Sequence, residues 1–503
     1  MSVAIDDTAA PPELPPAPGA GRWLALAVIG VSQLLIVLDA TIVNIALPTA
    51  QAELHITDAD RQWMITAYTL AFGGLLLLGG RIADYTGRKR AFIIGLLGFA
   101  AASALGGLAQ NAGMLFSARA LQGAFGALMA PAALSLLTVT FTEAKDRARA
   151  FGVYGAISGG GGAIGLLLGG VLTEYASWRW TLLVSAPIAI IAALAAVRYV
   201  GESRAVGNTR YDLPGAITST GGLVALVYGF TKAASDGWGA PLTVGLLAGA
   251  VLLLVAFVVI ETRTTHPLLP LRVVLDRNRG GAFLSALLIG VGLFGVFLFL
   301  TFYLQVTLGY SALMTGVAFL PFTFGIIGGA GVSAVLQTRV GPRVLMFGGM
   351  LLAAVGMVLL TRIGVHTNFW THVLPGEFVI SFGIGMTFGP MSNTALVGVG
   401  DHDAGVASAL INTTQQIGGS LGTALLNTIF TSAVAAYITA HQGSLTSPSQ
   451  LPALQQVATV HSYTVAFWVS AGLIAFASVI ALVLVRASRD EVATTSDAAL
   501  ATV

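Results

Sequence analysis

Long apolar runs dominate this chain, and they are separated by charges, prolines or polar clusters. From Trp23 to Ile45 the one ionisable side chain is Asp39, and about 20 apolar residues suffice to cross the hydrocarbon core of a bilayer. Runs of this kind predict fourteen membrane-spanning helices. They are expected at residues 22–45, 62–80, 90–109, 113–138, 149–173, 180–200, 213–232, 241–261, 280–306, 312–336, 343–363, 370–395, 403–436 and 463–486.

Composition supports the same class of protein. Of the 503 residues 56% are hydrophobic and 9% are charged, against about 25% charged in soluble domains. A soluble fold cannot bury so much apolar surface, so we expect an all-α polytopic membrane protein. Cysteine is absent, which excludes disulfides and thiolate metal sites. Residues 1–21 are rich in proline and acidic residues, and we expect a disordered tail there rather than a cleaved signal peptide.

The basic residues predict an orientation. An even number of helices places both termini on one side of the membrane, and nineteen of the 24 Lys and Arg fall in the tails and loops of that side. By the positive-inside rule both termini are therefore expected in the cytoplasm. A net charge of +2 gives no indication of a nucleic-acid partner. The predicted outer loops hold four basic residues, namely Arg61, Arg179, Lys232 and Arg362.

A weak internal repeat is visible. The glycine-rich segments 152–170 and 405–423 are offset by 253 residues, and the basic segments 80–90 and 337–343 are related by nearly the same offset. A parallel repeat of six helices with two extra helices between the copies fits this spacing, and such repeats usually flank a transport path. The expected parts are a tail at 1–21, a bundle at 22–200, two accessory helices within 201–279, a bundle at 280–487 and a tail at 488–503.

The segment after the second predicted helix, GRIADYTGRKR at 80–90, combines one acid with four bases. Its glycines permit a close helix end and a tight turn, and the acid can form a salt bridge that depends on conformation. The plainer interpretation is a positive-inside anchor. The pattern resembles the signature loop of the major facilitator superfamily, with Ile82 in place of Leu. The candidate latch residues are Gly80, Asp84, Gly87, Arg88, Lys89 and Arg90.

Further motifs resemble one family within that superfamily, the fourteen-helix drug:proton antiporters. LDATIVNIALP at 38–48 matches its first-helix motif, RALQGAFG at 119–126 its fourth-helix motif, and WRW at 178–180 the start of its sixth helix. The resemblance covers residues 22–487. It implies a major facilitator fold with 6+2+6 helices, and export of amphipathic, often cationic, drugs or antibiotics in exchange for inward-moving protons.

The fifth predicted helix departs from the family's antiporter motif, because Leu166 stands where the family has proline. A proline would remove a backbone hydrogen bond and bend the helix; without it, the four consecutive glycines at 159–162 are the alternative source of flexibility. The first three motif glycines recur every four residues and form a ridge that allows close helix packing; a gating role in addition is the alternative. These glycines are Gly161, Gly165, Gly169 and Gly170.

Charged residues inside the predicted spans are the main candidates for coupling. A charge at mid-bilayer costs about 2.5–3.5 kcal/mol on insertion scales and by default marks a pathway. Counting from the helix ends at 1.5 Å per residue places Asp39, Arg119 and Glu377 at a common depth of roughly 9–12 Å below the outer surface, where they could share a cavity. The alternatives are a static ion pair of Asp39 with Arg119, and a Glu377 that only faces the outer vestibule.

Export of a drug or antibiotic across the cytoplasmic membrane is the function that these features favour. A same-fold exporter of a metabolite or lipid precursor remains an alternative, as does a membrane enzyme or sensor. No P-loop, paired histidine motif or nucleophile–base set occurs in the sequence, so no cofactor or metal is expected.

The longest loop is expected at 437–462. The 21 Arg against three Lys suggest a GC-rich bacterial genome. Candidate substrate contacts, or equally helix-to-helix contacts, are Asn412, Gln415 and Gln416.

Overall fold

The computed structural model describes residues 19–141, 143–204, 212–264, 267–269, 271–399, 401–444 and 447–488. Every regular element in these residues is a helix, and fourteen segments are long and apolar enough to cross a membrane. This confirms the predicted all-α fold and the predicted number of spans. The expected tails at 1–21 and 488–503 lie almost wholly outside the described residues.

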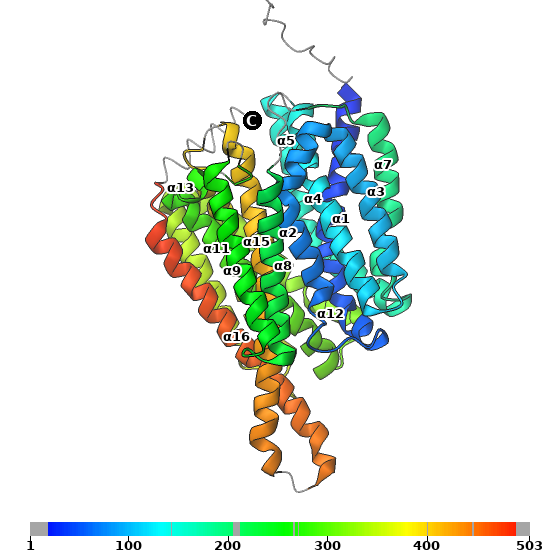
Figure 1. Ribbon diagram of the computed structural model, residues 1–503, viewed down its shortest axis with the longest axis vertical. Coiled ribbons are helices and arrows are strands. Elements are labelled where there is room, and N and C mark those ends of the chain that lie inside the picture. The colour runs from blue at the N-terminus through cyan, green and yellow to red at the C-terminus, as the bar shows by residue number, and fades with distance from the viewer. Residues whose placement is uncertain are drawn as a thin grey trace, which may run out of the picture.

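Two helical bundles and an accessory pair make up the molecule (Figure 1). The first bundle contains α1 (Gly19–Glu53), α2 (Trp63–Thr86), α3 (Arg88–Gly107), α4 (Ala112–Thr140), α5 (Ala144–Tyr175), α6 (Trp180–Leu183) and α7 (Ser185–Tyr199). The accessory helices are α8 (Leu213–Asp236) and α9 (Pro241–Arg263), followed by the short α10 (Leu271–Val274). The second bundle contains α11 (Arg277–Phe302), η1 (Tyr303–Thr307), α12 (Ala312–Ala318), α13 (Leu320–Leu360), η2 (Phe369–Val373), α14 (Leu374–Leu396), α15 (Asp401–His441), η3 (Gln442–Ser444), η4 (Pro448–Gln450) and α16 (Leu451–Leu484).

Equivalent helix pairs in the two bundles support the internal repeat. Helix α5 packs on α1, and α15 packs on α11. A Cβ at Gly169 of α5 would lie 2.7 Å from the carbonyl oxygen of Ile42, and a Cβ at Gly422 of α15 would collide with the carbonyl of Val291. The two glycines are 253 residues apart. Small residues at matching positions thus allow the same close backbone approach in both bundles.

The signature segment at 80–90 is almost entirely helical, whereas the sequence suggested a loop. Helix α2 continues to Thr86 and α3 begins at Arg88, so Gly87, with φ +112°, is the one non-helical residue between them. Gly341 makes the equivalent turn inside α13, with φ +77°. Both values lie in the left-handed region that glycine adopts without a steric penalty. The tight turn expected from the glycine spacing is therefore confirmed, and the repeat extends to it.

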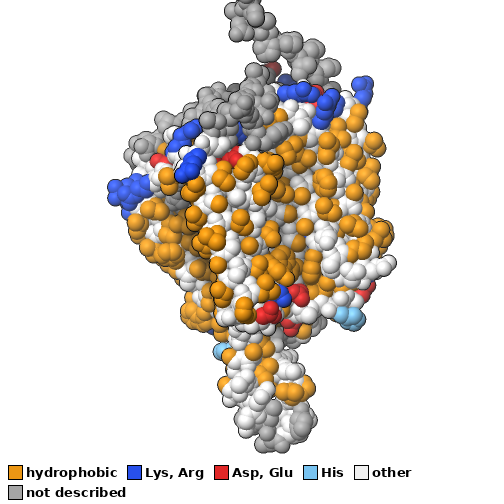
Figure 2. All heavy atoms as spheres, viewed as in Figure 1, with side chains coloured by type: hydrophobic (Ala, Val, Ile, Leu, Met, Phe, Trp, Pro, Cys, Tyr) orange, Lys and Arg blue, Asp and Glu red, His pale blue; other side chains and the backbone are white. Residues whose placement is uncertain are grey.

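The two ends of the molecule differ in charge. We call the end where α1 begins and α16 finishes the basic end, and the opposite one the distal end. Figure 2 shows Lys and Arg side chains gathered at the basic end, and mainly hydrophobic side chains over the flank between the two ends. This hydrophobic belt is the surface that a lipid bilayer would cover.

A helical hairpin projects from the distal end (Figure 1). Helix α15 runs to His441 and α16 begins at Leu451, so the expected long loop at 437–462 is wrong. Hydropathy detects where an apolar run ends, but the polar residues that follow are still good helix formers, and Pro452 is well placed in the first turn of α16. The two spans therefore continue as helices beyond the apolar belt.

Helix α8 lies across the line where the two bundles meet. It contacts both α2 and α15. Gln62, just before α2, donates from Nε2 to Thr231 Oγ1 at 2.8 Å, and Thr428 of α15 donates from Oγ1 to the carbonyl of Phe230 at 2.8 Å. Helix α9 packs on α8 and leaves most of its own surface exposed. One flank of the bundle interface is therefore covered by protein.

Candidate transport site

Asp39 and Arg119 form a buried ion pair inside the first bundle. Arg119 Nη1 donates to Asp39 Oδ2 at 2.7 Å and to Gln122 Oε1 at 3.0 Å. Gln122 Nε2 donates to the other carboxylate oxygen, Oδ1, at 3.0 Å and to Ser103 Oγ at 2.8 Å. The side chains of Asp39 and Arg119 are 0% and 2% exposed. The structure thus joins two of the three charges that the sequence placed at one depth.

Arg119 also holds the first turn of α2. Its Nε donates to the carbonyl oxygen of Met64 at 2.9 Å, and its guanidinium carbon lies 4.6 Å from the centre of the Tyr68 ring. Arg119 and Gln122 lie three residues apart and so share one face of α4. Neither α2 contact was predicted, because a scan for charges cannot detect a backbone acceptor or a tyrosine in an apolar run. The pair therefore connects α1, α2 and α4.

Gly123 allows α4 to approach α2 closely enough for these contacts. A Cβ at this position would collide with the carbonyl of Tyr68. We expect Gly123→Ala to destabilise the protein by about 1–3 kcal/mol and to impair transport, because the helices must separate beneath Arg119. Thermal unfolding in detergent measures the loss. The matched control is Gly245→Ala on α9, where a Cβ would meet no atom within 4 Å. Equal effects of the two changes would contradict this account.

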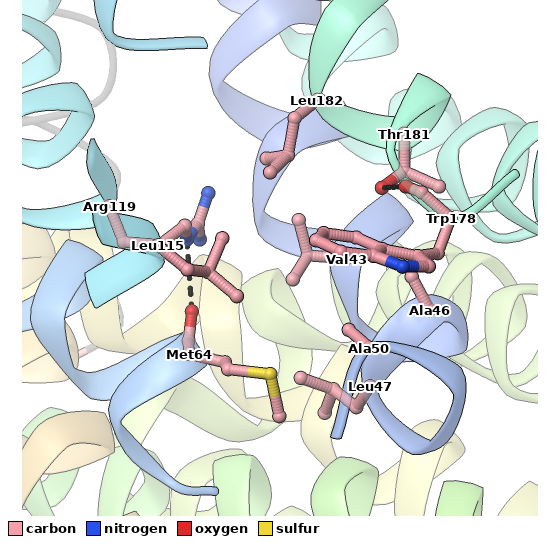
Figure 3. Close-up of a pocket in the computed structure, with 10 residues that line it drawn as sticks. All are labelled: Val43, Ala46, Leu47, Ala50, Met64, Leu115, Arg119, Trp178, Thr181 and Leu182. Carbon is pink, nitrogen blue, oxygen red and sulfur yellow. Dashed lines mark hydrogen bonds between the residues drawn. The ribbon is translucent and has the colours of Figure 1, made fainter. Parts of the chain in front are cut away.

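A small pocket adjoins the pair on its distal side (Figure 3). Its volume is about 10 Å³ and most of the side chains that line it are apolar, which does not favour a bound water. Arg119 and Met64 line one wall and Trp178 another. The Trp178 indole donates from Nε1 to Glu53 Oε2 at 2.6 Å, near the distal surface. A narrow and mainly apolar gap thus lies between the guanidinium and the distal end of the protein.

Glu377 occupies a separate site in the second bundle. It lies in the first turn of α14 and is 1% exposed, and neither of its carboxyl oxygens has a hydrogen-bond partner among the residues that the structure describes. The backbone N–H of Phe322 faces the carboxyl but donates to the Phe319 carbonyl at 3.2 Å. Helix α14 packs on α11, α13 and α15. No hydrogen bond or ion pair joins Glu377 to Asp39 or Arg119, since a common depth does not fix lateral position.

Hydrogen bonds between described residues join the two bundles in the distal half. The distal contacts close the interface on that side, so the molecule is in a conformation that is shut at its distal end. They are Gln305 Nε2 to the Ile45 carbonyl at 2.8 Å, the Leu313 N–H to Glu174 Oε2 at 2.8 Å, Thr69 Oγ1 with Ser420 Oγ at 2.7 Å, and Arg61 Nε to Asn427 Oδ1 at 3.3 Å.

Comparison with known proteins agrees with this architecture. The family model described as Major Facilitator Superfamily matches residues 29–423. The chain belongs to the major facilitator superfamily. It is therefore a multi-pass membrane transporter by family.

Curated relatives and a solved structure extend the comparison. The chain is 53% identical to a puromycin resistance protein of Streptomyces alboniger over 480 residues, covering 95% of this chain and 93% of the relative. It is 40% identical to a cephamycin export protein of Amycolatopsis lactamdurans, covering 83% and 88%. A bacterial homologue of the human lysosomal transporter Spinster, inward-facing and unoccupied, superposes with a TM-score of 0.64 at 15% identity, covering 93% and 98%. At that identity the structure supports the fold alone.

The signature segment of this major facilitator protein is bonded within its own bundle. Arg88 Nε donates to Asp84 Oδ1 at 2.9 Å, which forms the salt bridge expected from the sequence. The Lys89 N–H donates to Glu202 Oε1 at 3.0 Å, and Arg90 lies 3.9 Å from the other oxygen of that carboxylate. Glu202 was not predicted, because it follows α7 more than a hundred residues later. Gly80 faces Pro131 of α4, with 3.4 Å left for a Cβ.

The antiporter-motif glycines of α5 face two partners. A Cβ at Gly161 would lie 3.1 Å from Val37 of α1, and Gly165 and Gly169 face the same helix further along. Gly170 instead faces α12 of the second bundle, where a Cβ would lie 2.7 Å from the Cα of Leu313. Helix α5 is continuous from Ala144 to Tyr175. The ridge thus packs on the helix that carries Asp39, and its last glycine contacts the opposite bundle.

The three polar residues of α15 remain candidates for substrate contact. Asn412 is exposed, and Gln415 and Gln416 are partly exposed. No hydrogen bond ties any of their side chains to another described residue. The Cβ of Gln416 packs against Gly73 of α2, which places this residue at the bundle interface.

Proposed function

We propose that this protein exports an antibiotic or similar drug from the cytoplasm and takes up protons in exchange. Two relatives carry names that state puromycin resistance and cephamycin export, and the first is similar along nearly the whole chain. The positive-inside rule makes the basic end cytoplasmic, so the conformation described here would face the cytoplasm. The host membrane would be the cytoplasmic membrane of a GC-rich bacterium.

Asp39 carries the proposal, because it is a buried carboxylate paired with the guanidinium of Arg119. A nearby guanidinium favours the charged form of a carboxylate, whereas burial favours the neutral form. A carboxylate between these two influences can take a proton when the distal end opens and release it when the basic end opens. In this scheme Arg119 sets the balance, and Asp84 with Arg88 stabilises one state at the cytoplasmic face.

The substrate class follows from the relatives and from Glu377. We infer an amphipathic drug, with Glu377 as a second acid that attracts a cationic group. Two carboxyl oxygens without partners in a membrane-buried position are rare unless they serve a ligand or a proton. Asn412, Gln415 and Gln416 would supply adaptable hydrogen bonds. Protons and the lipid bilayer complete the expected partners, and no nucleic acid is among them.

Everted membrane vesicles test the proposal directly. Puromycin is added to energised vesicles that contain the protein, and release of lumenal protons is followed with a pH-sensitive dye. Drug-dependent proton release is expected, and empty-vector vesicles provide the control. Drug uptake without proton release would reject the coupling. If a panel of antibiotics gave no transport, the alternative of a metabolite or lipid-precursor exporter would be favoured.

Glu377→Gln tests the role assigned to the second acid. We expect export of a permanent cation such as ethidium to fall about tenfold or more, because a charged hydrogen bond contributes about 1.5–3 kcal/mol. Export of an uncharged dye of similar size should persist. Initial efflux rates of the two dyes from loaded cells give the comparison. Equal loss for both dyes would show that Glu377 acts in folding or proton transfer rather than in charge selection.

A further inference from the structure

Arg61 is a cation of the first bundle that is buried in the second. It lies just before α2 at the distal end and is 3% exposed. Its guanidinium carbon is 4.4 Å from the ring centre of Phe302 on α11 and 4.7 Å from that of Phe430 on α15. Tyr463 of α16 stacks on Phe430 at 5.0 Å, and its side chain faces Arg61. We call Phe302, Phe430 and Tyr463 the aromatic cage.

Hydrogen bonds stabilise the same contact between Arg61 and the second bundle. Arg61 Nε donates to Asn427 Oδ1 at 3.3 Å, and Asn427 Nδ2 donates to the carbonyl oxygens of Asp58 and Ala59 at 3.0 and 3.3 Å. The Asp58 carboxylate lies 3.6 Å from Arg61 Nη1. Asn427 belongs to the second bundle, whereas its two carbonyl partners precede α2. The distal ends of the bundles therefore cannot separate unless Arg61 leaves the aromatic cage.

A short chain of contacts links Arg61 to the buried ion pair. The Met64 N–H donates to the Arg61 carbonyl at 3.2 Å, and the Met64 carbonyl accepts from Arg119 Nε at 2.9 Å. Arg119 is in turn bonded to Asp39 at 2.7 Å. The guanidinium that neutralises Asp39 thus also holds the turn of backbone that carries Arg61.

We propose that Arg61 is the positioning residue through which the charge of Asp39 controls opening of the distal end. This rests on the proposed proton uptake at Asp39. A proton from the distal side adds to the carboxylate, so the attraction between Asp39 and Arg119 falls. Arg119 then shifts, the first turn of α2 follows through the Met64 carbonyl, and Arg61 leaves the aromatic cage. The other titratable groups that face these residues are Tyr68 at Asp39, and Asp58 and Tyr463 at Arg61.

Distance measurements between spin labels test this without any substrate. The chain contains no cysteine, so labels can be attached at Ala52→Cys on α1 and His366→Cys in the second bundle, both exposed at the distal end. Electron–electron resonance in nanodiscs then gives the fractions of closed and open distal ends. We expect Asp39→Asn, which mimics protonation, and Arg61→Ala each to raise the open-to-closed ratio about tenfold.

Non-additivity distinguishes coupling from a merely structural role. If Asp39 acts through Arg61, the double variant should be no more open than Arg61→Ala alone. Phe302→Leu, which keeps an apolar side chain but loses the ring, should reproduce the opening, and Arg61→Lys should partly restore closure. Arg362→Ala, at an exposed arginine of the same end, is the matched control and should leave the ratio unchanged.

Two results would overturn the inference. One is a wild-type distance distribution in both Arg61→Ala and Phe302→Leu; the other is additive opening in the double variant. Failure of the proposed function has a different signature, since Asp39→Asn would then leave drug-driven proton release intact whatever the distances show. Size-exclusion profiles identify any variant that misfolds, and Phe302→Leu still tests the aromatic cage if Arg61→Ala is lost.

Discussion

Asp39→Asn is expected to abolish proton release driven by a drug in everted vesicles. The amide has nearly the shape of the carboxylate but cannot carry a proton, so exchange of protons for drug should stop. Drug binding does not require that proton, so counterflow of labelled against unlabelled drug should continue in proteoliposomes. The two assays together separate loss of coupling from loss of substrate binding.

Asp236→Asn is the matched control for this change. Asp236 is an exposed acid at the distal end of α8, paired with Lys232 at 3.5 Å, and its replacement should leave proton release unchanged. Normal drug-driven proton release in Asp39→Asn would remove Asp39 from the mechanism. It would leave the Asp39–Arg119 pair as a static contact between α1 and α4.

Arg119→Ala should have the largest effect on stability. Removal of one partner from a buried ion pair costs about 3–5 kcal/mol, because the other charge is left without compensation. The change also frees the Met64 carbonyl and removes the contact with the Tyr68 ring. We expect a sharp fall in folded protein after detergent extraction, measured by size-exclusion chromatography and thermal unfolding.

A neutral double replacement separates charge from packing at this site. Asp39→Asn combined with Arg119→Met removes both charges and keeps most of the volume, so it should recover stability relative to Arg119→Ala but not proton coupling. Glu53→Gln is the surface comparison. Glu53 pairs with Arg179 at the same 2.7 Å, but the two side chains are 48% and 27% exposed, and such pairs contribute about 1 kcal/mol or less. A double variant as unstable as Arg119→Ala would contradict the electrostatic explanation.

The helices and the buried pair were predictable for the same physical reason. A bilayer requires about 20 apolar residues per span, so hydropathy finds each helix and the positive-inside rule orders the loops. The bilayer also makes an unpaired charge within a span energetically costly. Asp39 and Arg119 are opposite charges at one depth, so their pairing could be anticipated. Glu377 shares that depth but lies among α11, α13 and α15. The sequence gives the depth of a side chain in the membrane, whereas its lateral position depends on how the helices pack.

The contacts that fix the distal end could not be predicted in this way. The sequence identifies Arg61 only as one of four cations predicted on the outer side, since it precedes a helix and no apolar run surrounds it. Its burial comes from Phe302 and Phe430, which are more than 240 residues away along the chain. The Met64 carbonyl could not be predicted either, because every residue has a backbone carbonyl and the sequence does not show which one accepts a hydrogen bond from a side chain. Helix ends were also missed where polar residues continue a helix, as in α16 from Leu451.

The position of α8 makes the two flanks of the transporter unequal towards the lipid. On one flank α8 covers the line where α2 meets α15, through Thr231 and Phe230. On the other flank α5 faces α12 and α13, and in the described part of the chain α8 and α9 pack elsewhere. On the second flank the helices that meet lipid are therefore those of the two bundles themselves, whereas on the first flank they are α8 and α9. The accessory pair thereby makes a transporter built from two similar halves asymmetric in the surface that it presents to lipid.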